Sequence, residues 1–220
     1  MHRLLCGGMI FITGVAWGSA ISLTSNLPPD SGEYRTADQV HADYASEALF
    51  ELDNIRHHFF LNIAHPPCGP GCEMDQFDST LDADLFLDDV SQGHVVMTGQ
   101  VLVQVFNKNV GNPGTPFPTE MLQLNLSGVT PFGPILIRES PTLASLGQTQ
   151  IDALGNGTFQ IDSFFDVFTE LSLDSGATWI PSNGSSQVSL HETPEPGTFV
   201  LSGLALVGLG FLTRRRRAGR

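Results

Sequence analysis

Apolar and polar residues alternate along most of the chain between residues 80 and 190. Successive side chains of a β-strand point to opposite faces of a sheet, so this alternation predicts strands with one buried face. The predicted strands cover residues 80–90, 95–107, 121–128, 134–138, 158–173, 179–180 and 188–190. Turn-forming residues such as Gly155-Asn156-Gly157 and Asn183-Gly184 separate them. Short strands with frequent turns predict an all-β fold, specifically an antiparallel β-sandwich.

Two stretches before residue 80 have a less regular pattern. Residues 45–60 fit either a helix, because their apolar residues nearly form a stripe, or a pair of strands. Residues 21–38 show no clear period and are expected to form a flexible arm. The predicted extracytoplasmic domain therefore comprises residues 39–193.

The N-terminus is typical of a secretory signal peptide. His2 and Arg3 precede the apolar residues 4–16, and small residues follow at 18–20. This order predicts a signal peptide over residues 1–20, with cleavage after Ala20.

The C-terminus combines three features in a fixed order. Pro194, Glu195 and Pro196 precede the apolar residues 199–212, and a basic cluster follows. That cluster consists of Arg214, Arg215, Arg216 and Arg217. The apolar run is short for a membrane span, but the arginines are a strong stop signal that stays in the cytoplasm. The features predict a transmembrane helix that leaves the body of the protein outside.

Residues 194–220 resemble the PEP-CTERM sorting signal of Gram-negative bacteria. The resemblance implies recognition of Pro194, Glu195 and Pro196 by exosortase, a membrane-embedded transpeptidase-like enzyme. It also implies that the chain is anchored in the inner membrane before processing near this motif. Delivery to the cell surface or to the exopolysaccharide matrix would follow.

The body of the chain resembles uncharacterised secreted PEP-CTERM proteins. The similar residues are 137–143 and 159–174, within a resemblance that spans roughly residues 95–190. It implies a shared fold, and it carries no catalytic residues with it.

The charge of the body is more extreme than the −13 of the whole chain. Residues 21–193 hold four basic and 22 acidic residues, a net charge of −18. A nucleic-acid-binding protein needs a basic face, so this class is excluded. The acidity favours solubility and the binding of cations.

One octapeptide, residues 172–179, matches the Asp-box pattern of secreted β-proteins. The matching residues are Ser172, Asp174, Gly176, Thr178 and Trp179. Asp174 can accept hydrogen bonds from turn amides, and Gly176 can take a positive φ. A single copy in a short chain favours a structural hairpin over a sialidase.

Two cysteines, Cys68 and Cys72, are separated by three residues. An oxidising exterior favours a disulfide between them. The alternative is a mixed zinc site with His57, His58 and His65, although this spacing is loose for zinc.

Aspartates are concentrated just after the cysteines. The calcium candidates among them are Asp75, Asp78, Asp82 and Asp84. Calcium takes oxygen ligands of this kind, but the spacing fits no EF-hand loop. The alternative is a solvated strand face, and no other cofactor is expected.

These observations predict a non-enzymatic surface or biofilm-matrix protein. Its expected partners are the exosortase-type enzyme, the inner membrane before processing, and exopolysaccharide bridged by cations. A carbohydrate-binding module is the alternative, with Phe164, Phe165, Phe168 and Trp179 as the aromatic candidates. A secreted hydrolase is disfavoured because the common hydrolase motifs are missing from the sequence.

Overall fold

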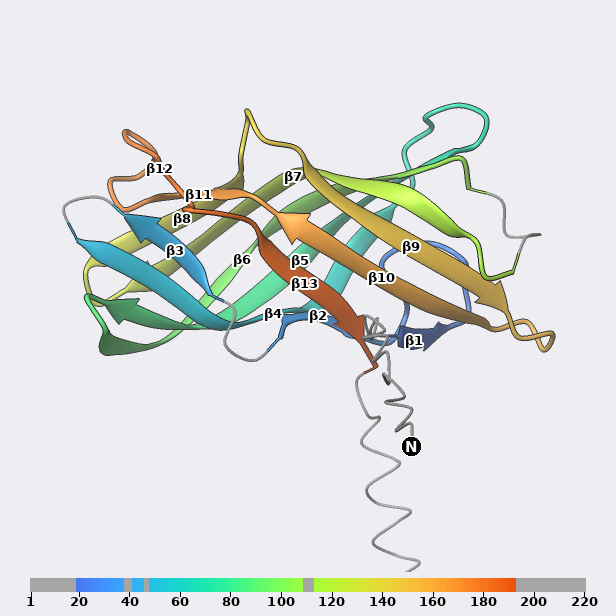
Figure 1. The fold of residues 1–220 in the computed structure, drawn as a ribbon, viewed down its shortest axis with the longest axis horizontal. Helices are drawn as coiled ribbons and strands as arrows, with labels where there is room; N and C mark the ends of the chain where they lie inside the picture. Colours follow the sequence, from blue (N-terminus) through green and yellow to red (C-terminus); the bar gives the residue numbers. More distant parts are fainter. Residues whose placement is uncertain (1–18, 38–40, 46–47, 109–112, 193–220) are drawn as a thin grey trace, which may run out of the picture.

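A computed structural model describes residues 19–37, 41–45, 48–108 and 113–192. The described residues are all-β, and neighbouring strands pair antiparallel throughout (Figure 1). The strands are β1 (Ser19–Ser22), β2 (Glu33–Thr36), β3 (Ala42–Ala45), β4 (Leu49–Ala64), β5 (Cys72–Leu87), β6 (Val90–Phe106), β7 (Pro116–Thr130), β8 (Gly133–Glu139), β9 (Ser145–Ala153), β10 (Phe159–Val167), β11 (Thr169–Ser172), β12 (Ile180–Pro181) and β13 (Ser186–His191).

The sheet closes on itself into a barrel. Eight strands pair in the ring β2-β4-β5-β6-β7-β9-β10-β13 and back to β2. The predicted all-β, antiparallel class is confirmed, but the predicted sandwich is wrong. A sandwich has two sheets with free edges, whereas the pairing of β13 with β2 and of β7 with β9 removes the edges in this ring.

A second set of strands continues the wall beyond the ring. β7 pairs first with β9 and then, over residues 125–130, with β8. β8 pairs with β11, and β11 pairs with β12. On the opposite flank β3 pairs with β4. The backbone of Asn183, after β12, donates to Asp43 O of β3 at 2.8 Å, which links the two flanks.

The alternation found in the sequence separates the barrel interior from its outer face. Along β5, residues at every second position from Asp75 to Leu85 are buried, and those between them are partly exposed. The predicted face of β6, residues 95, 97, 101, 103 and 105, is buried as a set. An eight-stranded barrel is just wide enough for its side chains to fill it. Two interior cavities, of about 20 and 30 Å³, each have room for one or two waters.

β4 is the most irregular long strand. Its register against β5 shifts three times, and Asn54, Phe59 and Asn62 at these shifts have φ of 52–53°. Each shift marks a bulge, where an extra residue is accommodated by left-handed backbone. In the described part of residues 45–60, Ala45 ends β3 and residues 49–60 belong to β4, so this part forms strands and not a helix. The bulges explain the imperfect period that made a helix plausible there.

Residues 21–38 are not the predicted flexible arm. Their described part contains the end of β1 and all of β2, and β2 pairs with β13 and β4. Leu27 is 1% exposed and belongs to the core. The segment therefore forms part of the barrel wall and its packing.

The described ends of the chain lie next to each other. A Cβ on Gly32 would lie 3.1 Å from both Ala20 Cβ and His191 O, so the start of β1 and the end of β13 meet there. Ala20, the predicted last residue of the signal peptide, is 1% exposed and pairs with Ile161 of β10. The rest of the predicted signal peptide, the transmembrane helix and the arginine cluster lie outside the described residues.

Candidate functional sites

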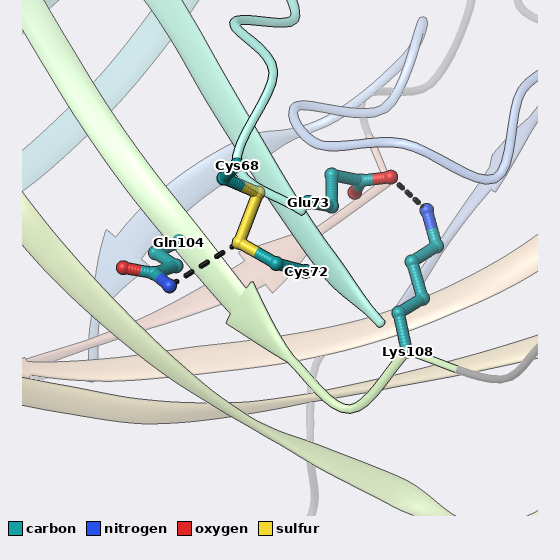
Figure 2. Close-up of a disulfide and its surroundings, with 5 residues drawn as sticks. All are labelled: Cys68, Cys72, Glu73, Gln104 and Lys108. Atoms are coloured by element: carbon teal, nitrogen blue, oxygen red, sulfur yellow. Dashed lines mark hydrogen bonds and ion pairs between the residues drawn. A yellow bond between two sulfur atoms is a disulfide. The ribbon is translucent and has the colours of Figure 1, made fainter. Parts of the chain in front are cut away.

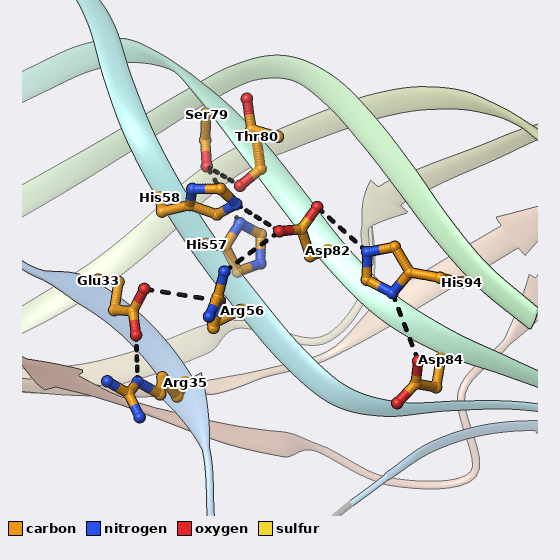
Figure 3. Close-up of polar contacts among 10 residues, drawn as sticks. All are labelled: Glu33, Arg35, Arg56, His57, His58, Ser79, Thr80, Asp82, Asp84 and His94. Carbon is orange, nitrogen blue, oxygen red and sulfur yellow. Dashed lines mark hydrogen bonds and ion pairs between the residues drawn. The ribbon is translucent and has the colours of Figure 1, made fainter. Parts of the chain in front are cut away.

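A polar network covers the outer face of β4, β5 and β6 (Figure 3). Asp82 of β5 lies at its centre, with Oδ2 2.7 Å from His58 Nε2 and 3.4 Å from Arg56 Nη2. His94 of β6 lies 3.6 Å from the other oxygen of Asp82, and its Nδ1 lies 3.3 Å from Asp84. These contacts satisfy the charges across three strands, and they connect the long strands laterally.

The same network continues to β2. Glu33 is buried, and it pairs with Arg35 on its own strand and with Arg56 of β4 at 3.5 Å. The positive charges of the two arginines offset the cost of burying this carboxylate, because a buried charge is stable only when it is paired. These contacts connect β2 to β4, at the place where β2 completes the ring of strands.

The four calcium candidates do not converge. Asp78, Asp82 and Asp84 lie on the outer face of β5, where side chains of neighbouring strands already contact them. Asp75 is fully buried on the opposite face, and its Oδ1 lies 2.7 Å from His65 Nδ1. Burial, and then the neighbouring Glu73, raise the pKa of Asp75 well above its usual range. The four carboxylates therefore do not form one ion site.

The cysteines are joined at one end of the barrel. Cys68, in the loop before β5, forms a disulfide with Cys72, the first residue of β5, and Gln104 Nε2 donates to Cys72 Sγ at 3.3 Å (Figure 2). The predicted disulfide is confirmed. The mixed zinc site is wrong, because its thiols are bridged and its histidines are dispersed. His57 is buried beside Ser79, His58 contacts Asp82, and His65 contacts Asp75.

Lys108 lies on the other side of the disulfide and holds the N-terminal segment in place. Its Nζ donates to Ser25 O at 2.6 Å and to Asn26 Oδ1 at 3.0 Å, and it forms an ion pair with Glu73. The side chains of Lys108 and Glu73 are only 10% and 12% exposed. Sequence reasoning missed this contact because its partners lie more than 80 residues apart.

The octapeptide 172–179 forms a compact turn. Asp174 Oδ1 accepts hydrogen bonds from Ser172 Oγ and Thr178 N, each at 2.8 Å, and Oδ2 accepts one from Thr178 Oγ1 at 2.6 Å. Thr178, and then Ser172, lower the pKa of Asp174 to about 2 through these bonds. Gly176 has φ +88°. The Asp-box assignment stays a prediction, but each contact in the turn is local.

Trp179 packs beside this turn. Arg138 lies over its ring, with Cζ 4.0 Å from the centroid, and Arg138 also pairs with Glu170 at 2.6 Å. A cation over the face of a Trp ring is attracted by its quadrupole. The contacts attach the turn to β8 and β11.

The aromatic candidates do not form one platform. Phe165 is 2% exposed in the barrel core, where its ring lies 5.7 Å from that of Tyr34. Phe164 precedes it on β10 and therefore faces the opposite way. Trp179 is covered by Arg138. Phe165 is therefore excluded from the sugar-binding surface of the alternative hypothesis, whereas Phe164, Phe168 and Trp179 are each partly exposed.

The sequence did not predict two sites that contain carboxylates. Glu139, in an open pocket of about 390 Å³ that Glu120 also lines, has its pKa raised to about 7, chiefly by burial. A second group, His41, Asp43 and Glu51, gathers on the β3–β4 hairpin. The signal that would have found it is the alternation of ionisable and apolar residues, with His41 and Asp43 before residues 46–47 and Glu51 and Asp53 after them.

The comparison with protein families decides what the C-terminus is. The family model described as the PEP-CTERM protein-sorting motif matches residues 192–217. The chain carries a PEP-CTERM sorting motif. This motif implies export, and sorting of the membrane-anchored protein by an exosortase-type enzyme. Neither the comparison with curated proteins nor that with solved structures gave a match.

The PEP-CTERM motif begins where the barrel ends. β13 ends at His191, and the match starts at residue 192. Pro194 follows three residues after His191, a distance of at most about 11 Å in an extended chain. Among the described residues no helix is long and apolar enough to cross a membrane. Pro194–Pro196 and the arginine cluster lie outside the described residues.

Proposed function

We propose that this protein is a non-enzymatic component of the cell surface or of the extracellular matrix in a Gram-negative bacterium. The sorting motif is the observation that carries the proposal, because it implies an extracellular destination. An exosortase-type enzyme would recognise the motif while the chain is anchored in the inner membrane. The barrel would then act outside the cell, in the envelope or in the exopolysaccharide of a biofilm.

The barrel supports a role that does not depend on an enclosed ligand site. Its two described interior cavities have room for only one or two waters each, and their linings are mostly apolar. Several outer carboxylates are engaged in cross-strand contacts with His, Asn and Arg side chains. These features fit a stable, acidic structural unit of the envelope or matrix. Exopolysaccharide bridged by cations fits the −18 charge of residues 21–193.

Fractionation of cells with and without the sorting enzyme tests the proposal. With the enzyme, antibody to the barrel should detect the protein at the surface or in the matrix. Without the enzyme, the protein should stay in the inner-membrane fraction. An unchanged distribution would contradict sorting by this route.

A motif variant separates recognition from general effects on export. Replacement of Pro194, Glu195 and Pro196 by alanine should reproduce the loss of the enzyme. Replacement of Pro66 and Pro67, in the loop beside the disulfide, changes prolines outside the motif and should leave the distribution unchanged.

A further inference from the structure

Four ionisable residues face outward on the β3–β4 hairpin. Asp43 of β3 lies directly opposite Glu51 of β4 in the strand register. His41 lies two residues before Asp43, and Asp53 lies two residues after Glu51, so all four belong to one face. One ligand atom from each of His41, Asp43 and Glu51 lies within 4.8 Å of the other two. The hairpin therefore brings an imidazole and two carboxylates together.

This arrangement is unfavourable without a cation. Like charges directly opposite each other on paired strands destabilise a sheet. Asp43 Oδ1 is shielded from solvent and has no hydrogen-bond partner in the described part of the chain. An enclosed, unpaired carboxylate oxygen costs free energy, which a bound cation would offset.

The same face carries a surplus of negative charge. The carboxylates of Asp43, Glu51 and Asp53 gather around the single imidazole of His41.

The backbone holds these groups in place. Asp43 O accepts the hydrogen bond from Asn183 N at 2.8 Å, and His41 O accepts one from Ser186 Oγ at 3.5 Å. The hairpin is thus tied to β12 and β13 as well as to β4. Donor atoms on a fixed scaffold lose little entropy when they bind an ion.

The geometry points to a binding site for a divalent transition-metal ion, with His41, Asp43 and Glu51 as the ligands. His41 Nδ1 lies 3.0 Å from Asp53 Oδ1, so a carboxylate outside the ligand set contacts the ring. A metal-binding histidine usually makes this kind of second contact with a carboxylate. An imidazole with two carboxylates suits Zn²⁺, whereas Ca²⁺ takes six to eight oxygen ligands.

Calorimetry on the full chain in detergent, after removal of metals with a chelator, tests the site. Wild type should bind one equivalent of Zn²⁺, and Zn²⁺ should raise its melting temperature more than Ca²⁺ does. His41→Gln, Asp43→Asn and Glu51→Gln should each weaken Zn²⁺ binding at least about tenfold. Asp78→Asn changes an outer carboxylate that accepts from Asn62, and it should leave Zn²⁺ binding unchanged.

The metal-free variants give a second readout. Asp43→Asn removes one of two opposed charges, so without metal it should melt at or above the temperature of wild type. Three results would overturn the assignment: no Zn²⁺ binding at about 100 µM, unchanged binding in the three site variants, or equal stabilisation by Ca²⁺. A metal-free Asp43→Asn protein that melts well below wild type would also contradict the charge argument.

Discussion

His57 shows how one residue can be misread when only its neighbours in sequence are known. Its place beside His58 in the sequence suggests a zinc ligand, yet it is buried in the barrel, with Nδ1 3.2 Å from Ser79 Oγ. Burial, and then the adjacent His58, lower the pKa of His57 to about 4. The residue is therefore neutral in the folded protein at neutral pH, and it lines both interior cavities.

This pKa predicts a loss of stability in acid. The unfolded chain binds a proton at His57 near pH 6.5, whereas the folded chain does so only near pH 4. Stability should therefore fall as the pH drops from about 6.5 toward 4, and His57 should contribute about 2–3 kcal/mol of the loss by pH 4.5. Urea unfolding at pH 7 and pH 4.5 measures this. His57→Gln should lose about 2 kcal/mol less than wild type over this range, and an equal loss would refute the assignment.

At the scale of elements, the long strands depend on close backbone contacts. A Cβ on Gly99 of β6 would lie 1.8 Å from Asn125 O of β7, so the strands approach as only glycine allows. The N-terminal segment depends instead on Lys108, which joins residues 25–26 to β5. The alternation of apolar and polar residues predicts neither the close approach at Gly99 nor the contacts of Lys108.

Gly99→Ala should destabilise the barrel by about 1–3 kcal/mol or more, because β6 and β7 must move apart. Gly184→Ala is the matched control, since a Cβ there meets nothing within 4 Å. Thermal unfolding of both variants measures the difference. Equal melting temperatures would show that the two strands are not so tightly apposed.

Lys108→Met should cost about 3 kcal/mol, because it leaves Glu73 partly buried without its partner. Hydrogen exchange should rise in residues 23–31, which Lys108 anchors. Glu73→Gln in the same chain removes the orphaned charge and should restore part of the loss. If exchange in residues 23–31 stays at the wild-type level, Lys108 is not their anchor.

Features of the fold that depend on local patterns could be predicted from the sequence, whereas those that depend on contacts between distant residues could not. Alternation over residues 95–107 is local, so β6 and its buried face could be predicted from the sequence. The described residues 21–37 are held in place by Lys108 and by the core around Leu27, through residues that are distant in sequence. The hairpin site of Asp43 and Glu51 needs the register of two strands, which no local pattern specifies.

At the scale of the whole molecule, two pairings decide between a barrel and a sandwich. β13 pairs with β2 across about 150 residues, and β7 pairs with β9 while it also pairs with β8. The strand pattern is the same for both architectures, because in each one face is buried and the other is exposed. Closure also brings the described ends of the chain together beside Gly32.

The position of Ala20 predicts the order of processing and folding. Ala20 is buried in β1, so a peptidase can reach the bond after it only before β1 pairs with β10. Folded full chain should therefore resist signal peptidase in detergent, while chain that is still unfolded should be cleaved. Cleavage after Ala20 of the folded protein at the same rate would contradict this order.

A sorting signal attached directly to the acidic barrel should be removed when the protein is released. The mass of the protein released at the cell surface measures this. We expect a chain that ends near Pro194–Pro196, without the arginines at 214–217. Released protein that still ends at Arg220 would contradict it.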